Sequence, residues 1–179
     1  LGGTGSYLLD LISKTNVKEI HIYDNDIFSS HNAFRTPGAP DINKLNGEVS
    51  KLSYLYEIYS KMHRGLIKHE YYINPENIKE LSGYDFVFIS IDNSKSRSLI
   101  IKYLLSNKIS FIDVGIGIEI NGTDLSATAR VTVNEDPTSN FVNNEEILEI
   151  DDIYKSNIQI AEINALNACM AVIKWKQFY

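Results

Sequence analysis

A glycine-rich turn, LGGTGS, opens the sequence and leads directly into an apolar helical segment. Gly2, Gly3 and Gly5 suit a backbone that approaches a phosphate closely, because a Cβ atom at these positions would block the approach. Gly2 and Gly5 also match the second and third glycines of a dinucleotide fingerprint whose first glycine would precede Leu1. We therefore expect the first strand of the fold to lie upstream of Leu1. The turn alone does not distinguish NAD from ATP.

Apolar segments of two kinds alternate along the chain and indicate its fold class. The run YDFVFISID is almost continuously apolar and ends in a carboxylate, as expected for a central parallel strand buried on both faces. The segment IGIEINGTDLSATARVTV predicts a β-hairpin that turns around Asn121 and Gly122. We therefore expect one α/β domain over residues 1–179, with a Rossmann-like mixed sheet. Its first part is parallel, an antiparallel hairpin forms one edge, and helices cover both faces.

Caps, breakers and apolar periodicity set the expected elements. Asp41 is the expected N-cap of a long helix that reaches about Met62, and Asn74 is the expected cap of a short helix. The acidic segment 134–152 has little periodicity and predicts a surface loop. The expected strands cover 17–24, 65–73, 84–92 and 110–115, and the expected helices cover 6–13, 41–62, 74–81, 94–106 and 157–178.

Composition excludes several classes of protein. The sequence has no apolar run of the roughly 20 residues that a membrane span requires, and no signal peptide is visible. Cys169 is the single cysteine, which rules out an internal disulfide framework and suits a reducing cytoplasm. It lies in the apolar stripe of the last helix, so we expect a buried, inert thiol. The net charge of -6 argues against nucleic acid as the main partner.

Three loops should meet at the carboxyl ends of the parallel strands, where doubly wound sheets bind their ligands. They are the glycine turn, DNDIFSSHNAFR and SIDNSKSR. Asp24 lies 19 residues beyond Gly5, where a carboxylate commonly takes the ribose hydroxyls of either nucleotide. Asn32 and Arg35 follow it closely. An arginine offers a planar fork of donors to phosphate oxygens, so this pair is a candidate contact to a polyphosphate.

Further residues favour ATP over NAD. The glycine turn and the helix dipole already satisfy the pyrophosphate of NAD, so an added arginine and lysine indicate more negative charge to neutralise. Lys51 is the candidate lysine, with Lys44 as a substitute. Asp92 ends the central strand, where a carboxylate can bind Mg²⁺, and Asn93 is a further candidate nucleotide contact. Each has a plainer alternative: Asp92 as a helix cap, Arg35 in a surface ion pair and Lys51 as a solvated side chain.

The blocks LGGTGS, IYDNDIFSSHNAFR and FISIDNSKSR together resemble the ThiF/MoeB superfamily, the adenylating fold of ubiquitin-activating enzymes, from Leu1 to about Val133. The ending NIQIAEINALNACMAVIKWK more loosely resembles the final helix of bacterial ThiF-family adenylyltransferases. The resemblance implies ATP and Mg²⁺ binding by a homodimer, and AMP transfer to a carboxylate. That carboxylate is typically the C-terminal glycine of a ubiquitin-like or sulfur-carrier-like protein. The implied roles are phosphate contacts for Gly3 and Gly5, ribose binding for Asp24, triphosphate contacts for Asn32, Arg35 and Lys51, and organisation of Mg²⁺ for Asp92.

The chemistry implied by this resemblance fits what the sequence lacks. A C-terminal carboxylate is already ionised at neutral pH, so its attack on the α-phosphorus needs positioning and charge neutralisation rather than a general base. The sequence departs from the family in its TPGAP stretch and in a longer spacing from Arg35 to Lys51. The two CxxC pairs of many relatives are absent, so no zinc is expected, and the segment after Val133 has no thioester cysteine.

Two alternatives belong to other classes. A non-catalytic ThiF-like subunit would bind nucleotide or a partner and only support an active half. An NAD-dependent Rossmann oxidoreductase would account for Gly2, Gly5 and Asp24, but not for Asn32, Arg35 and Asp92 together.

Overall fold

The computed structural model describes residues 1–135 and 160–179. Its helices are α1 (Gly3–Ile12), α2 (Ser30–Ala33), α3 (Lys51–Tyr59), α4 (Ser94–Ser106) and α6 (Ala161–Lys176), with the 3₁₀ helices η1 (Ile42–Lys44) and η2 (Ile78–Gly83). Its strands are β1 (Ile20–Tyr23), β2 (Ile27–Ser29), β3 (Asn46–Ser50), β4 (Leu66–His69), β5 (Phe86–Ile89), β6 (Ser110–Asn121) and β7 (Asp124–Asn134).

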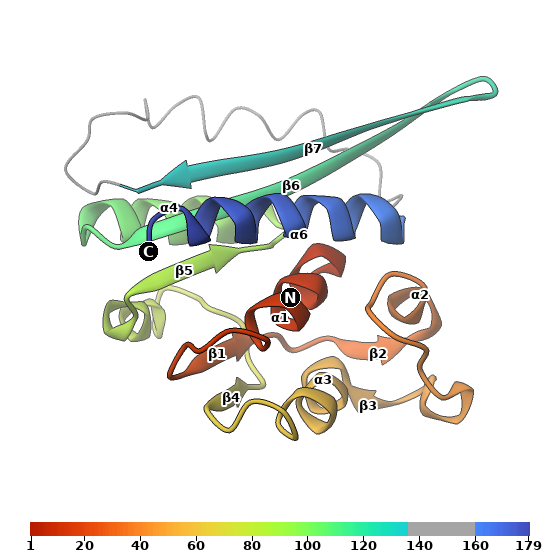
Figure 1. Ribbon diagram of the computed structural model, residues 1–179, viewed down its shortest axis with the longest axis horizontal. Helices are drawn as coiled ribbons and strands as arrows, with labels where there is room; N and C mark the ends of the chain where they lie inside the picture. The colour runs from red at the N-terminus through yellow and green to blue at the C-terminus, as the bar shows by residue number, and fades with distance from the viewer. Residues whose placement is uncertain (136–159) are drawn as a thin grey trace.

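The sheet is mixed, as the sequence predicts. β1 pairs with β4 and β5 pairs with β6, both in parallel, whereas β6 and β7 form a long antiparallel hairpin at one edge (Figure 1). The hairpin turns between the partners Asn121 and Asp124, where Gly122 takes a positive φ of 66° that glycine adopts without strain. A second, short antiparallel pair joins β2 to β3.

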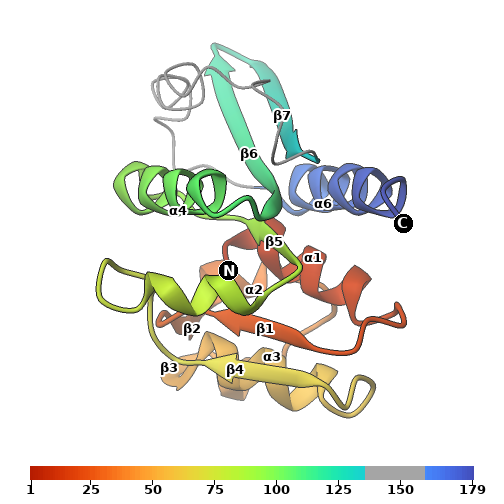
Figure 2. The same ribbon diagram turned by 90° about the vertical axis from the view of Figure 1, so that its left-hand side faces the viewer.

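Helices cover both faces of the sheet. Figure 2 shows α4 and α6 on opposite sides of β6. The residues of β5 alternate between two cores: Ile89 packs with η2 and α4, whereas Phe88 packs against the core that α1 and α6 share. This alternation is the two-sided burial of a central parallel strand. Among residues 1–135 and 160–179, no helix combines the length and apolar character that a membrane span requires.

The parallel part of the sheet is divided by a groove. Within the described chain, β1 pairs only with β4, and β5 pairs only with β6, so no ladder joins β1 to β5. A cavity of about 1370 Å³ lies between them, under the side of α1. Both strands line it along their full lengths.

The long helix expected from Asp41 to Met62 is wrong. Asp41 caps only the single turn of η1, where its carboxylate accepts a hydrogen bond from Asn43 N at 2.9 Å. The chain then extends into β3, and α3 begins at Lys51 behind a new cap, Ser50. Pairing of β3 with β2 supplies tertiary hydrogen bonds that helical periodicity does not reveal.

The expected burial of Cys169 is also wrong, because its side chain is exposed on α6. The buried face of α6 carries small and amide side chains: Asn164, Asn167, Ala168, Ala171 and Val172. Its larger apolar residues Leu166, Met170 and Ile173 point outward with Cys169. Of the expected loop over 134–152 and helix over 157–178, residues 136–159 lie outside the described residues.

Candidate functional site

A buried ion pair lies at the carboxyl end of β1. Lys51 is the first residue of α3, and its Nζ atom lies 2.5 Å from Oδ2 of Asp24 and 2.7 Å from Oδ2 of Asp26. The Asp24 and Lys51 side chains are 3% and 4% exposed. The structure therefore joins the residues expected to hold the ribose and the phosphates, and it rules out the solvated alternative for Lys51.

Asp26 and Tyr72 belong to the same cluster, although the sequence analysis did not single them out. Burial acts to raise the pKa of Asp26, but hydrogen bonds from Lys51 and Tyr72 outweigh it and lower that pKa. Asp26 accepts a hydrogen bond from the Tyr72 hydroxyl group and thereby raises the pKa of Tyr72 to about 12. The charge of Asp92 acts on the pKa of Tyr72 in the same direction, as the weakest of the causes. Two features of the sequence could have pointed to them: Asp26 lies two residues after Asp24, and Tyr72 follows β4 closely.

A network around the start of α3 fixes the position of Lys51. The Ser50 side chain accepts a hydrogen bond from Ser53 N at 3.0 Å and so caps the helix. The Ser50 and Ser53 hydroxyls both donate to Oε1 of Glu70, the residue after β4, and lower the pKa of that carboxyl to about 2. At the start of the capped helix, the backbone N–H of Lys51 donates a hydrogen bond to the carbonyl oxygen of Asp26 at 2.9 Å.

The glycine turn forms the start of α1. Gly2 is the N-cap and supplies no side chain, so the first backbone N–H groups of the helix keep their donor capacity for an anion. A Cβ atom on Gly3 would lie 2.6 Å from Nδ2 of Asn164, and one on Gly5 would lie 2.9 Å from Cδ2 of Leu1. A Cβ on Gly2 would lie 3.6 Å from its nearest neighbour. Packing against the buried Asn164 therefore requires Gly3, whereas a Cβ on Gly5 would displace the end of the Leu1 side chain and Gly2 leaves its surroundings open.

Asn32 and Arg35 lie on a separate segment, α2 and the loop that follows it. Asn32 is buried, and its Oδ1 accepts hydrogen bonds from Ser29 N at 3.0 Å and from Ser29 Oγ at 2.6 Å, which caps α2. Arg35 is half-buried, and within the described residues its buried Nε atom has no hydrogen-bond partner. A buried guanidinium N–H without an acceptor suits an anionic ligand. Among the described residues, no hydrogen bond or ion pair joins Asn32 or Arg35 to the Asp24–Lys51 pair.

Asp92 is exposed in the loop between β5 and α4. The N-cap of α4 is Asn93, whose side chain accepts a hydrogen bond from Ser96 N at 2.9 Å. The structure therefore rules out the capping alternative for Asp92 and leaves its carboxylate for a ligand. Arg97, one turn further along, is buried and bonds Asp113 of β6 through two nitrogens, at 2.9 and 2.6 Å.

The residues present fit a nucleotide in part. A helix N-terminus, the unpartnered Nε of Arg35 and the exposed Asp92 are suited to phosphates and to a hydrated cation. Asp24 already has partners within the protein, because its carboxylate accepts a hydrogen bond from Asp26 N at 2.8 Å and pairs with Lys51. The described part of the chain has no group of three or more metal-ligating side chains. The Lys44 side chain lies outside the described residues, so Lys51 is the lysine that the structure brings to the cluster.

Comparison with known proteins identifies relatives over nearly the whole chain. The model of the ThiF family matches residues 1–172. Over 124 residues the chain is 29% identical to the tRNA threonylcarbamoyladenosine dehydratase of Haemophilus influenzae, a match that covers 64% of this chain and 44% of that protein. The chain thus spans less than half the length of this curated relative.

Solved structures share the fold. The Escherichia coli tRNA N6-threonylcarbamoyladenosine dehydratase TcdA in complex with AMP superposes with a TM-score of 0.72 at 18% identity, covering 99% of this chain and 82% of that one. E. coli MccB with ATP gives a TM-score of 0.65 at 15% identity, covering 99% and 53%. At these identities the likeness establishes the fold, which is the α/β architecture expected from the sequence.

Proposed function

Because its residues 1–172 match the ThiF family model, this chain belongs to the ThiF family, and we propose that it uses ATP to adenylate a carboxyl group. The observation that carries the proposal is this family match over residues that include the buried pair of Asp24 and Lys51 and the exposed Asp92. Relatives of the same fold have been solved with AMP and with ATP bound, which supports a nucleotide in this chain as well.

The chain's own residues suit that chemistry. The open N-terminus of α1 and the unpartnered Nε of Arg35 would neutralise phosphate charge, and Lys51 would join them after leaving Asp24. Asp24 would then accept hydrogen bonds from the ribose, with Gly2, Gly3, Gly5, Asn32 and Asn93 as the remaining proposed contacts. Mg²⁺ bound with ATP would stabilise charge on the pyrophosphate leaving group, and Asp92 would hold it directly or through water.

The proposed acceptor is the C-terminal carboxylate of a ubiquitin-like or sulfur-carrier-like protein, or of a peptide. MccB, which shares the fold, has been solved with the peptide MccA, and the net charge of -6 disfavours nucleic acid. The curated relative favours a second candidate, a carboxyl group on a modified tRNA nucleoside. Since the chain covers 44% of that relative, residues outside this segment could supply tRNA contacts.

ATP–pyrophosphate exchange by the full-length protein tests the proposal. We expect exchange that requires Mg²⁺, is abolished by EDTA, and depends on a ubiquitin-like protein ending in glycine from the same genome. The same protein lacking its last glycine is the control. Exchange supported by tRNA carrying threonylcarbamoyladenosine instead would select the second candidate. ATP binding without exchange with either acceptor would identify a non-catalytic subunit and reject the proposal.

The Asp92→Asn variant tests the metal role. Since Asp92 is exposed and caps no helix, we expect at least a 100-fold loss of exchange, with the urea midpoint of unfolding unchanged. Lys95→Ala, an exposed change in the first turn of α4, is the matched control and should keep full exchange. Full activity of Asp92→Asn would remove the assigned carboxylate from the mechanism.

A homodimer is part of the proposal. Leu166, Met170 and Ile173 are 51%, 40% and 58% exposed and form an outward row on α6, which suits a subunit contact. Light scattering of the full-length protein should give a dimer, and Met170→Glu should shift it to a monomer. A monomeric parent protein would reject the dimer.

A further inference from the structure

Helix α6 buries two asparagines on the face that meets the rest of the protein. Asn164 and Asn167 are 1% and 0% exposed, whereas the apolar residues Leu166 and Met170 lie on the outer face of the helix. Because they are three positions apart, the two asparagine side chains project from the same side of α6. Burial of an amide is unfavourable unless it forms hydrogen bonds. The bonds that these two amides make therefore indicate what this face of α6 does.

Asn164 bonds to the glycine turn. Its Oδ1 atom accepts a hydrogen bond from Oγ1 of Thr4, the second residue of α1, at 2.7 Å. Its Nδ2 atom donates to the carbonyl of Ile160 at 3.1 Å, which fixes the amide with its oxygen toward Thr4. The same amide fills the space beside Gly3, where a Cβ atom would lie 2.6 Å from Nδ2. Thr4 itself is 5% exposed, so its hydroxyl points into the protein.

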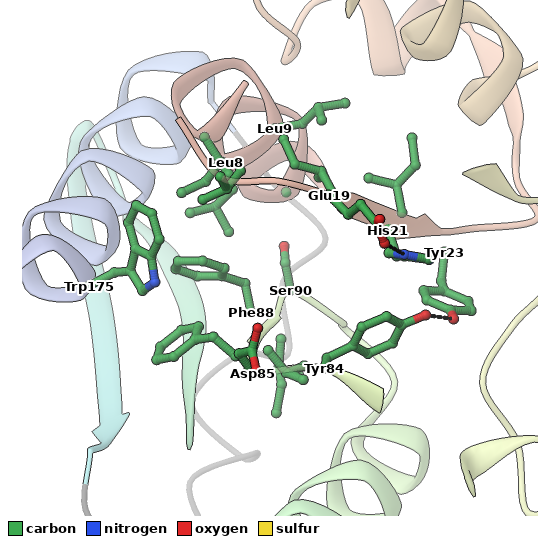
Figure 3. Close-up of a pocket in the computed structure, with 18 of the residues that line it drawn as sticks. Leu8, Leu9, Glu19, His21, Tyr23, Tyr84, Asp85, Phe88, Ser90 and Trp175 are labelled. Atoms are coloured by element: carbon green, nitrogen blue, oxygen red, sulfur yellow. Dashed lines mark hydrogen bonds and ion pairs between the residues drawn. The ribbon is translucent and has the colours of Figure 1, made fainter. Parts of the chain in front are cut away.

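Asn167 and the end of α6 fix this helix to the sheet. The Nδ2 atom of Asn167 donates to the carbonyl of Gly115 in β6 at 3.0 Å. Trp175 meets the ring of Phe88 in β5 at a centroid distance of 6.1 Å, and Leu8 of α1 belongs to the same apolar core (Figure 3). A continuous series of contacts therefore runs from the sheet through α6 to the first turn of α1.

The first turn of α1 carries the backbone donors of the proposed phosphate contact. Gly2 caps the helix without a side chain, and Ser6 N makes the first intrahelical bond, to Gly2 O at 3.2 Å. The N–H groups of residues 3–5 precede that bond, as the orphan donors of a helix do. A rotation of this turn redirects all three groups together. Since hydrogen bonds weaken steeply below about 120°, binding of a phosphate requires one orientation of the turn.

Thr4 is the one residue among positions 2–5 that has a side chain, because the others are glycine. Its hydroxyl is therefore the side-chain group of this turn that can bond to the rest of the protein. We propose that Asn164 is a positioning residue for ATP, which acts through Thr4 to orient the backbone N–H groups of residues 3–5 toward the phosphates. This inference rests on the proposed use of ATP. It extends the site to α6, and Asn164 acts without touching the nucleotide.

Thr4→Val tests the bond with little change of shape, because both side chains are β-branched. The loss of the hydroxyl should raise the Kd for ATP about tenfold. The kcat of ATP–pyrophosphate exchange should stay within about twofold, since the turn binds the phosphates equally before and during the reaction. Thr4→Ser keeps the hydroxyl and should bind ATP like the parent protein. In calorimetric titrations of the full-length protein, a parent-like Kd for Thr4→Val would overturn the proposal.

Asn164→Ala, alone and combined with Gly3→Ala, separates positioning from packing. In the double variant the new Cβ atom at position 3 lies in the space that the Asn164 amide leaves, so the two losses of stability should be less than additive. Thr4 still lacks its acceptor, so the Kd for ATP should remain about tenfold above that of the parent protein. Recovery of the parent affinity in the double variant would mean that Asn164 only fills space, which contradicts the proposal.

Val172→Ala is the control for a general loss of stability, since Val172 is buried on the same helix. It should lower the urea midpoint of unfolding and leave the Kd for ATP unchanged. If its Kd instead rises as far as that of Thr4→Val at a similar loss of stability, the effect at Thr4 is destabilisation and the proposal is wrong.

Hydrogen exchange in the free full-length protein gives a readout that needs no ATP. The amide of Ser6 makes the first bond of α1, and in Thr4→Val it should exchange about tenfold faster than in Val172→Ala. Both variants are measured at urea concentrations that give them the same free energy of unfolding. Equal Ser6 rates would show that the Thr4–Asn164 bond does not fix the turn. A parent protein that binds no ATP would reject the proposed function, whereas the Ser6 rates would still decide this point.

Discussion

The Nζ atom of Lys51 lies 2.5 Å from Oδ2 of Asp24, and both side chains are buried. Asp24, expected to bind the ribose, and Lys51, expected to bind the phosphates, thus neutralise each other's charge. A nucleotide that uses both must separate them and supply new partners to each. The proposed binding of ATP at this site would therefore be coupled to a rearrangement at the start of α3.

Lys51→Met should destabilise the protein strongly. The variant leaves Asp24 buried beside Asp26 without its cation, and breaking a buried pair in this way costs about 3–5 kcal/mol. Urea unfolding of the full-length protein measures the change. Asp24→Asn combined with Lys51→Met should recover part of the loss, because both charges are then removed. A free energy of unfolding within about 0.5 kcal/mol of the parent for Lys51→Met would show that the pair is not stabilising.

Arg35→Ala should weaken ATP binding with little effect on stability. Its buried Nε has no hydrogen-bond partner among the described residues, so the loss of this atom breaks no internal hydrogen bond. A hydrogen bond to a charged group contributes about 1.5–3 kcal/mol, which corresponds to roughly a 10- to 100-fold higher Kd for ATP. Isothermal titration calorimetry measures it, with Arg64→Ala, an exposed change beyond α3, as the control. An unchanged Kd would show that Arg35 does not contribute to ATP binding.

Gly2→Ala should lower the affinity for ATP, whereas Gly3→Ala should lower the stability of the fold. The added Cβ on Gly3 would lie 2.6 Å from the buried amide of Asn164, so Gly3→Ala should cost about 1–3 kcal/mol of stability. The Cβ on Gly2 would meet Ser90 at an ordinary 3.6 Å, and its φ of -76° suits alanine. Gly2→Ala should therefore keep its thermal midpoint and lose ATP affinity. Normal affinity in a stable Gly2→Ala protein would argue against phosphate contact at this residue.

The carboxyl group of Glu70 should titrate far below its ordinary pKa of 4.5. Hydrogen bonds from Ser50 and Ser53 favour its charged form and bring its pKa to about 2. Because the folded-state pKa is depressed, the stabilisation is fully present above about pH 4.5 and is lost as the pH falls toward 2. A ¹³C NMR titration of the Glu70 carboxyl measures this directly, and Ser53→Ala should move the midpoint upward. A midpoint near 4.5 in the parent protein would mean that the network is not formed in solution.

The parts of the fold that the sequence predicts correctly depend on local or strongly periodic signals. The glycine turn, the apolar run that ends near Asp92 and the hairpin at Gly122 each have a physical cause within a few neighbouring residues. The sequence offered Asp92 as a possible cap of the following helix, whereas the structure gives that role to Asn93.

The incorrect predictions concern structure that is set by distant partners. β3 forms through pairing with β2, so the stretch between Asp41 and Ser50 was assigned to a helix. The exposure of Cys169 follows from which face of α6 is buried, and that face carries Asn164, bonded to Thr4 of α1, and Asn167, bonded to Gly115 of β6, rather than large apolar residues. Tyr72 joins the site through a contact with Asp26, 46 positions away, which no local pattern reveals.

The bond from Thr4 Oγ1 to Oδ1 of Asn164, 2.7 Å long, joins residues 160 positions apart. The packing of the glycine turn therefore depends on α6, which a ribosome synthesises near the end of residues 1–179. During synthesis the glycine turn leaves the ribosome before α6, so it cannot yet contact Asn164. Contacts between residues so far apart in the sequence form late and slowly. The packing of this turn against α6 is therefore completed only after α6 has emerged.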